Sequence, residues 1–242
     1  MTGKKINISG LFIILFFMVF PFGGYGQGAD GIINKYLRQI GGGWKVKRLD
    51  DLTLRLDVYI NGVPFEAYVY YKNPNRYKQV LLYEGDTVQV QVFDGKRAGA
   101  VELSQLQEMA PYDEKSFRIQ AYLFPEAYMK ELQLNAQLIG PAKLNGNPAQ
   151  EVEFTDAQGY NFTAWYHAGD DMKMRTVYPI GDPLKDQELQ VDILRYRKIG
   201  GIAMPLEKRI TTAGFIIRME LTATSRKEIP ESMFVLPENS GN

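Results

Sequence analysis

The 242-residue sequence contains no cysteine and a single histidine, His167. Without cysteine the chain can form no disulfide, and it offers no residue for the acyl anchor that a lipoprotein carries at its signal cleavage site. We therefore expect no lipid anchor. A chain of this length can bury a sufficient apolar core without disulfides, so their absence does not argue against a folded domain.

Residues that usually carry catalysis or bind metals are scarce. A serine hydrolase would need His167 as its base and a Gly-x-Ser-x-Gly elbow, which the sequence lacks. A zinc site needs several ligands, and Asp170-Asp171 and Glu84-Gly85-Asp86 lie at expected turns, where Asp and Gly are favoured for backbone reasons. We interpret His167 as a solvent-facing residue at a strand end. The sequence predicts no enzyme, no metal and no cofactor, with a hydrolase based on two carboxylates as a remote alternative.

Neither sign of charge is in excess. The sequence has 28 basic and 28 acidic side chains, and the basic ones are scattered along the chain. Nucleic-acid binding draws on clustered Lys and Arg. We therefore expect no nucleic-acid partner.

The one long apolar run lies near the N-terminus. Two lysines precede the run Leu11–Phe20, which is shorter than the roughly 20 residues of a membrane-spanning helix. Gly24-Tyr25-Gly26 then places small residues where signal peptidase needs them. We predict a signal peptide at residues 1–26 and export of residues 27–242 as one domain. An uncleaved membrane anchor is the alternative.

The exported part begins with a predicted amphipathic helix. Asp30 is a favourable N-cap and Gly41 a favourable stop. Between them apolar residues recur at helical spacing and form one face; they are Ile32, Ile33, Tyr36, Leu37 and Ile40.

From Trp44 the apolar period changes to two, which is typical of strands with one buried face. The clearest case is Leu52–Ile60, and turn sequences such as Asp94-Gly95 separate the runs. We predict about eleven antiparallel strands. The segment 103–132 is different, because it is rich in Leu, Gln, Glu, Met and Ala and is divided by prolines. It predicts two or three short helices that pack on the sheet.

Aromatic residues are abundant, with 15 Tyr, 13 Phe and 2 Trp, and several strands are apolar on more than one face. One interpretation is an ordinary β-sandwich core with tyrosines on the exposed side. The other is a strongly curved sheet that encloses an apolar cavity, partly closed by the helices. In that case the predicted cavity lining is Leu54, Leu56, Val58, Phe65, Val69, Val90, Val92, Phe154, Phe162, Val191, Ile193 and Met219. The predicted lid is Ile33, Tyr36, Leu37, Phe117, Leu123, Phe124 and Met129.

Four segments carry a family resemblance: the helix end Tyr36–Gly43, the turn Phe93-Asp94-Gly95, the segment Tyr196–Pro205 and the tail Ile229–Pro237. With the order helix, strands, helical insertion, strands, they resemble the superfamily of lipoprotein-localisation carriers, the LolA/LolB type, over nearly the whole exported region. The resemblance implies a mainly β fold: an unclosed half-barrel with the N-terminal helix and the short helical insertion over the concave face.

The resemblance also implies a function. Carriers of this superfamily hold the acyl chains of lipoproteins in the apolar hollow and move them across the periplasm. We therefore expect a periplasmic, monomeric carrier and chaperone that binds lipid or lipoprotein acyl chains, as in outer-membrane lipoprotein sorting. Its protein partner would be an outer-membrane acceptor or an inner-membrane donor. The alternative is a non-enzymatic regulatory or scaffolding module of the envelope, in which side chains fill the hollow.

Overall fold

The computed structural model describes residues 28–102, 105–109, 111–181 and 187–236. The predicted signal peptide, residues 1–26, lies outside them. Thirteen strands are present in the described residues, against the predicted number of about eleven. They are β1 (Asp51–Ile60), β2 (Val63–Lys72), β3 (Arg76–Tyr83), β4 (Asp86–Phe93), β5 (Ala98–Glu102), β6 (Gln105–Glu108), β7 (Asn135–Leu144), β8 (Asn147–Thr155), β9 (Asn161–His167), β10 (Lys173–Pro179), β11 (Glu188–Ile199), β12 (Ile202–Thr212) and β13 (Phe215–Ser225).

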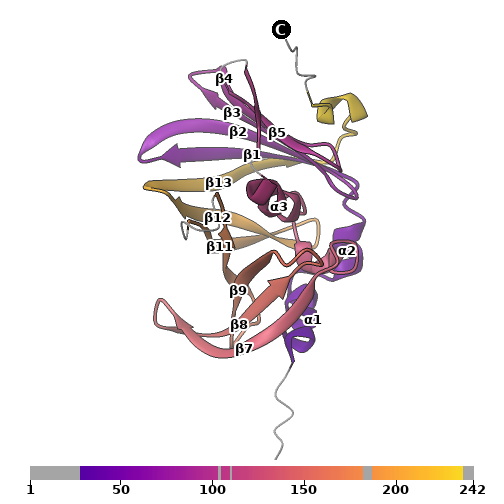
Figure 1. The fold of residues 1–242 in the computed structure, drawn as a ribbon, viewed down its shortest axis with the longest axis vertical. Helices are drawn as coiled ribbons and strands as arrows, with labels where there is room; N and C mark the ends of the chain where they lie inside the picture. Colours follow the sequence, from indigo (N-terminus) through magenta and orange to yellow (C-terminus); the bar gives the residue numbers. More distant parts are fainter. Residues whose placement is uncertain (1–27, 103–104, 110, 182–186, 237–242) are drawn as a thin grey trace, which may run out of the picture.

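All of these strands form one antiparallel sheet. Its order is β6-β5-β4-β3-β2-β1-β13-β12-β11-β10-β9-β8-β7, so the first and last strands of the chain pair at its centre. The sheet is not closed, since β6 and β7 are its two edges. Figure 1 shows that the sheet curves strongly, which confirms the predicted open, curved architecture.

The pattern of strand β1 explains why this sequence forms a half-buried sheet. Leu54, Leu56 and Val58 are buried, whereas Arg55 and Asp57 between them are exposed. Successive side chains of a strand point to opposite faces. Each strand of this kind therefore gives the sheet one apolar face, which needs a cover.

Helices supply part of that cover. In Figure 1, α3 lies inside the curve of the sheet, while α1 and α2 lie beside one end of it. The segment 103–132, predicted to be helical, contains the short strand β6 near its start. The composition of this segment, rich in Leu and Gln, is typical of helices, but β6 is a strand because it pairs with β5. The helices are α1 (Ala29–Gln39), α2 (Gly43–Lys47), α3 (Pro111–Gln120) and the 3₁₀ helices η1 (Pro125–Tyr128) and η2 (Glu231–Phe234).

Helix α1 begins one residue before the predicted N-cap. Gly28 occupies the cap position, and Asp30 lies in the first turn, where its charge complements the helix dipole. The helix stops before Gly41, as predicted. Gly41 has a φ of 114°, and a side chain there would overlap the carbonyl oxygen of Gly201. The end of α1 is therefore held against the turn between β11 and β12.

The concave side of the sheet is filled with side chains near α1. There the ring centroids of Tyr36 and Tyr166 lie 5.4 Å apart, and the rings of Phe154 and Phe162 stack at 4.8 Å. All four side chains are buried in the main core. No helix in the described part of the chain is long and apolar enough to span a bilayer.

A second, smaller core lies on the outer face of β4. Val92 packs there against Ile229 and Phe234 from the C-terminal segment. The Lys72 ammonium donates to the Ile229 carbonyl oxygen at 3.0 Å and helps to hold this segment in place. The outer face of the sheet is thus apolar at this position as well.

Candidate functional site

A cavity of about 470 Å³ lies between the inner face of the sheet and helix α3. This volume falls within the range of small-molecule sites, about 300–1,000 Å³. The residues that line it come from both halves of the chain. They are Leu54, Leu56, Val58, Ile60, Val69, Tyr71, Tyr77, Gln79, Leu81, Gln89, Gln91, Ala100, Met109, Asp113, Ser116, Phe117, Gln120, Leu123, Ile180, Leu189, Met204, Pro205, Lys208, Ile210, Ile217 and Met219.

The floor of the cavity is apolar because of the strand register. Leu54 lies opposite Val69 on β2, and Val58 lies opposite Met219 on β13. Directly paired residues of antiparallel strands share one face. These pairs therefore place a continuous aliphatic surface beneath α3, across the seam where β1 meets β13.

The wall formed by β3 and β4 is more polar. Gln79 and Gln91 lie directly opposite each other in the register, and the Tyr77 hydroxyl donates to the Gln79 side-chain oxygen at 2.8 Å. Burial raises the pKa of Tyr77 well above its usual value, so its phenol stays neutral. The cavity therefore combines an aliphatic floor with neutral hydrogen-bonding groups on one wall.

Helix α3 covers the cavity and is held by polar contacts to both sides of the sheet. Glu114 accepts a hydrogen bond from the Ala98 backbone N–H at 3.1 Å on the β5 side. Asp113 accepts one from the Gly181 backbone N–H at 2.6 Å beyond β10. Phe117, from the same helix, lines the cavity. A third contact is the ion pair between Arg118 of α3 and the buried Asp156, at 3.1 Å. Helix α3 therefore covers the cavity and is tied to the rest of the fold at three points.

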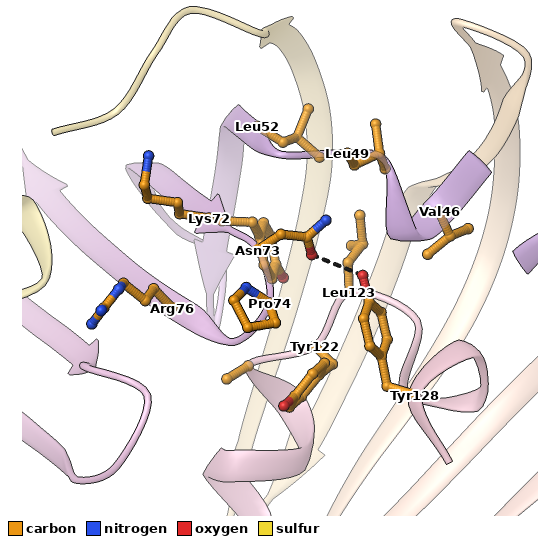
Figure 2. A pocket seen from close by; sticks show the side chains of 12 residues that line it. Val46, Leu49, Leu52, Lys72, Asn73, Pro74, Arg76, Tyr122, Leu123 and Tyr128 are labelled. Atoms are coloured by element: carbon orange, nitrogen blue, oxygen red, sulfur yellow. Dashed lines mark hydrogen bonds between the residues drawn. The ribbon is translucent and has the colours of Figure 1, made fainter. Parts of the chain in front are cut away.

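A second pocket lies at the junction between the helical insertion and the β2–β3 turn, and Figure 2 shows its lining. Its volume of about 20 Å³ has room for only one or two water molecules. The Tyr128 hydroxyl donates to the Asn73 side-chain oxygen at 2.8 Å (Figure 2). The Asn73 amide donates in turn to the Lys47 carbonyl oxygen at 2.8 Å. The residues around this pocket connect the helical insertion to the β2–β3 turn and to α2, and the pocket is too small for a ligand.

A buried ion pair fixes η1 on the other side. Glu126 accepts hydrogen bonds from the Lys173 ammonium and from the Tyr166 hydroxyl, both at 2.8 Å and both on the same oxygen. The Lys173 ammonium also lies 5.4 Å from the centroid of the Tyr36 ring. The end of the insertion that follows α3 is thus fixed to β9, β10 and α1.

Seven of the predicted site residues border the cavity. Five come from the predicted lining and two, Phe117 and Leu123, from the predicted lid. Their role in binding remains a prediction. The five lining residues are Leu54, Leu56, Val58, Val69 and Met219.

The face of β4 that points toward the cavity is the one opposite to the predicted face. Val90 and Val92 belong to the outer core with the C-terminal segment, whereas Gln89 and Gln91 line the cavity. Both faces of β4 are buried in part, so alternation alone could not orient the strand. Phe65 does not border the cavity; its ring centroid lies 5.1 Å from that of Tyr83.

The remaining predicted residues belong to the filled part of the molecule or its margin. They pack in or against the main core and do not border the cavity. These residues are Phe154, Phe162 and Val191 from the predicted lining and Ile33, Tyr36, Leu37, Phe124 and Met129 from the predicted lid. Ile193 lies opposite Lys208 in the register but is not among the residues that border the cavity.

Lys208 is the cavity residue that the sequence analysis missed most clearly. It stands between Glu207 and Arg209 on β12, and alternation puts these two neighbours on the outer face. The signal was present in the sequence, since alternation along β12 leaves Lys208 on the same face as Ile210.

His167 and the acidic turns play local roles. His167 ends β9, and its Nδ1 lies 3.0 Å from an Asp170 carboxylate oxygen, which also accepts the Met172 backbone N–H at 3.1 Å. These contacts hold a turn. The described residues contain no group of three or more His, Asp or Glu side chains placed to hold a metal ion.

Comparison with solved structures identifies the fold. A LolA superfamily protein from Nitrosomonas europaea matches with a TM-score of 0.60 and 11% identity, over 86% of this chain and 98% of that chain. An outer-membrane lipoprotein-sorting protein domain from Vibrio parahaemolyticus matches with a TM-score of 0.53 and 9% identity, over 84% and 97%. A DUF1329 family protein from Desulfovibrio piger matches with a TM-score of 0.52 and 14% identity, over 81% and 92%.

These likenesses show that the chain has a LolA-like fold, which confirms the resemblance found in the sequence. No protein-family model matches the sequence, and no curated protein matches it either.

Proposed function

We propose that this protein is a non-enzymatic carrier that holds the acyl chains of a lipid or a lipoprotein in the cavity beneath α3. The observation that carries the proposal is the cavity of about 470 Å³ with its aliphatic floor. The LolA-like fold supports it, and so does the predicted signal peptide, which would deliver the domain to the periplasm. In this role the chain would serve outer-membrane lipoprotein sorting or the transport of another lipid.

Transfer energetics explain how such a cavity can hold cargo. Each methylene group removed from water contributes about 0.8 kcal/mol, so ten methylenes contribute roughly 8 kcal/mol before the costs of ordering are subtracted. Release requires a movable cover. Helix α3 would be that cover, because it lies over the cavity and is held by three polar contacts, from Asp113, Glu114 and Arg118, that have to break for it to move.

The test is binding of a fluorescent long-chain acyl probe to the exported domain. Gln91→Trp places an indole ring in the cavity from a half-buried position. A ring that displaces about three methylenes of the ligand removes roughly 2.4 kcal/mol, or about fifty-fold in Kd. Val58→Trp is a second blocking variant. Tyr59→Trp is the control, because Tyr59 is the neighbour of Val58 on the outer face of β1.

We expect saturable binding to the wild-type protein and to the control, and at least about tenfold weaker binding to both blocking variants. Organic extraction of the purified protein, followed by mass spectrometry, should also recover acyl lipid. No uptake of the probe together with no lipid in the extract would rule the carrier out. Equal binding by all four proteins would place the acyl chain outside this cavity.

The alternative, a regulatory or scaffolding module, predicts a hollow filled by side chains. Its experimental signature is a stable complex with an envelope protein that survives Gln91→Trp. The open volume beneath α3 favours the carrier.

A further inference from the structure

Among the described residues, Lys208 is the basic side chain that lines the cavity. Its cross-strand neighbours are Ile193 on β11 and Met219 on β13. Val58, beyond Met219, continues the row on β1. A cation on an aliphatic surface of this kind is unfavourable unless a partner satisfies it.

The charge of Lys208 is retained at neutral pH. Burial, with a contribution from the nearby charge of Lys173, lowers the pKa of its ammonium to about 8. A group with this pKa is mostly protonated at pH 7. The cavity therefore presents a positive charge to whatever occupies it.

Three other cations on the same three strands are paired with carboxylates. Arg195, Arg209 and Arg218 on the outer face each lie within 2.8 Å of a carboxylate oxygen. Lys208, in contrast, forms no ion pair or hydrogen bond with any side chain that the structure describes. The inner face of β12 thus holds a cation whose partner is not in the described part of the chain.

Two other charged groups are near enough to matter. Asp113 of α3 also lines the cavity, but its carboxylate is engaged by the Gly181 backbone N–H and makes no ion pair with Lys208. Lys173 of β10 is paired with Glu126. Neither of these two groups forms an ion pair with Lys208.

We propose that Lys208 binds the anionic headgroup of an amphiphile whose acyl chain lies on the aliphatic floor of the cavity. This inference rests on the proposed carrier function and specifies its cargo: a chain that ends in a carboxylate or a phosphate. The chain would extend from Lys208 across Met219 and Val58. An anionic oxygen at Lys208 would form a charge-assisted hydrogen bond, which none of the described side chains makes with this residue.

The test compares three ligands with the same chain, decanoate, decyl phosphate and decanol, by calorimetric titration below their micelle-forming concentrations. A hydrogen bond to a charged group is worth a factor of about 10 to 100 in affinity. The wild-type protein should bind one or both anions about 10- to 100-fold more tightly than decanol. The anion that binds more tightly identifies the headgroup as carboxylate or phosphate.

Two variants complete the test. Lys208→Met should bind decanol at least as well as the wild type but lose the preference for anions, while Lys208→Arg should keep it. Thermal unfolding of Lys208→Met provides a check on folding; we expect it to be no less stable than the wild type, because a lone cation has been removed from apolar surroundings.

Equal binding of decanol and the anions to the wild type, or a preference that survives Lys208→Met, would overturn the assignment of Lys208 while leaving the carrier in place. Failure of all three ligands, and of the long-chain probe as well, would instead contradict the proposed carrier function.

Discussion

The buried ion pair between Glu126 and Lys173 allows a quantitative test of how the helical insertion is held. Lys173→Met keeps the aliphatic stem of the side chain and removes its charge. The Glu126 carboxylate would then stay buried, at 4% exposure, with the Tyr166 hydroxyl as its remaining hydrogen-bond donor. The variant therefore isolates the loss of one charge in an otherwise unchanged site.

The magnitude follows from the burial of both partners. Removing one member of a buried ion pair typically costs about 3–5 kcal/mol, because the other charge is left without compensation. The loss of the ammonium over the Tyr36 ring at 5.4 Å acts in the same direction. For a domain of this size the midpoint of thermal unfolding should fall by about 6 to 20 °C.

The double variant Glu126→Gln/Lys173→Met gives the control. Its amide oxygen still accepts the Tyr166 hydroxyl, and no charge remains buried, so it should lie within about 2 kcal/mol of the wild type. Urea unfolding of the wild type, both single variants and the double variant measures the coupling directly. If the effects of the single substitutions simply add in the double variant, or if Lys173→Met costs less than about 1 kcal/mol, the reasoning is refuted.

Three further predictions concern other parts of the fold. Gly41→Ala should lower the free energy of unfolding in urea by about 1–3 kcal/mol, because φ is 114° and the new methyl group would meet the Gly201 carbonyl oxygen. The control is Gly43→Ala, whose methyl group would make ordinary contacts and should leave the stability nearly unchanged. Equal effects of the two substitutions would contradict this account. Val92→Ala should cost about 2 kcal/mol of stability through the outer core without weakening acyl-probe binding, and weakened binding would place Val92 in the site after all. The stability of the wild type relative to Lys208→Met should rise as the pH increases from about 8 to 10.5, because in that window the unfolded chain still holds the proton of Lys208 while the folded chain has lost it. Thermal unfolding of both proteins across this range measures the difference in stability. A difference that stays constant would show that folding does not lower the pKa of Lys208.

The sequence predicted the strands well because their periodicity is local. The alternation of β1, with Leu54, Leu56 and Val58 on one face, needs no tertiary information, and these three residues border the cavity. The apolar stripe of α1 was also evident. The residues that this stripe covers were not evident from the sequence, because Tyr36 contacts Tyr166, which is distant in the sequence.

Strand β4 shows the limit of such reasoning. Its valines and glutamines alternate perfectly, and hydropathy alone turns the valines toward the cavity. The structure turns Gln91 inward, because Val92 is covered on the outer face by Ile229 and Phe234. That choice depends on a C-terminal segment whose apolar residues also needed a partner. Lys208 was missed for a related reason, because the cavity lining was predicted from apolar residues on one face of a strand, and a lysine does not fit that pattern.

The pairing of β1 with β13 has a consequence for how the molecule is made. The floor of the cavity crosses this seam, where Val58 pairs with Met219, so the two sides of the hollow unite only when the last strand arrives. Contacts so distant in sequence form slowly, because a long loop must close first. Until then β1 and β12 are open edges that can pair with other chains. A chain without β13 therefore cannot form the complete cavity, and truncation before residue 215 should yield an aggregation-prone chain rather than a smaller folded domain.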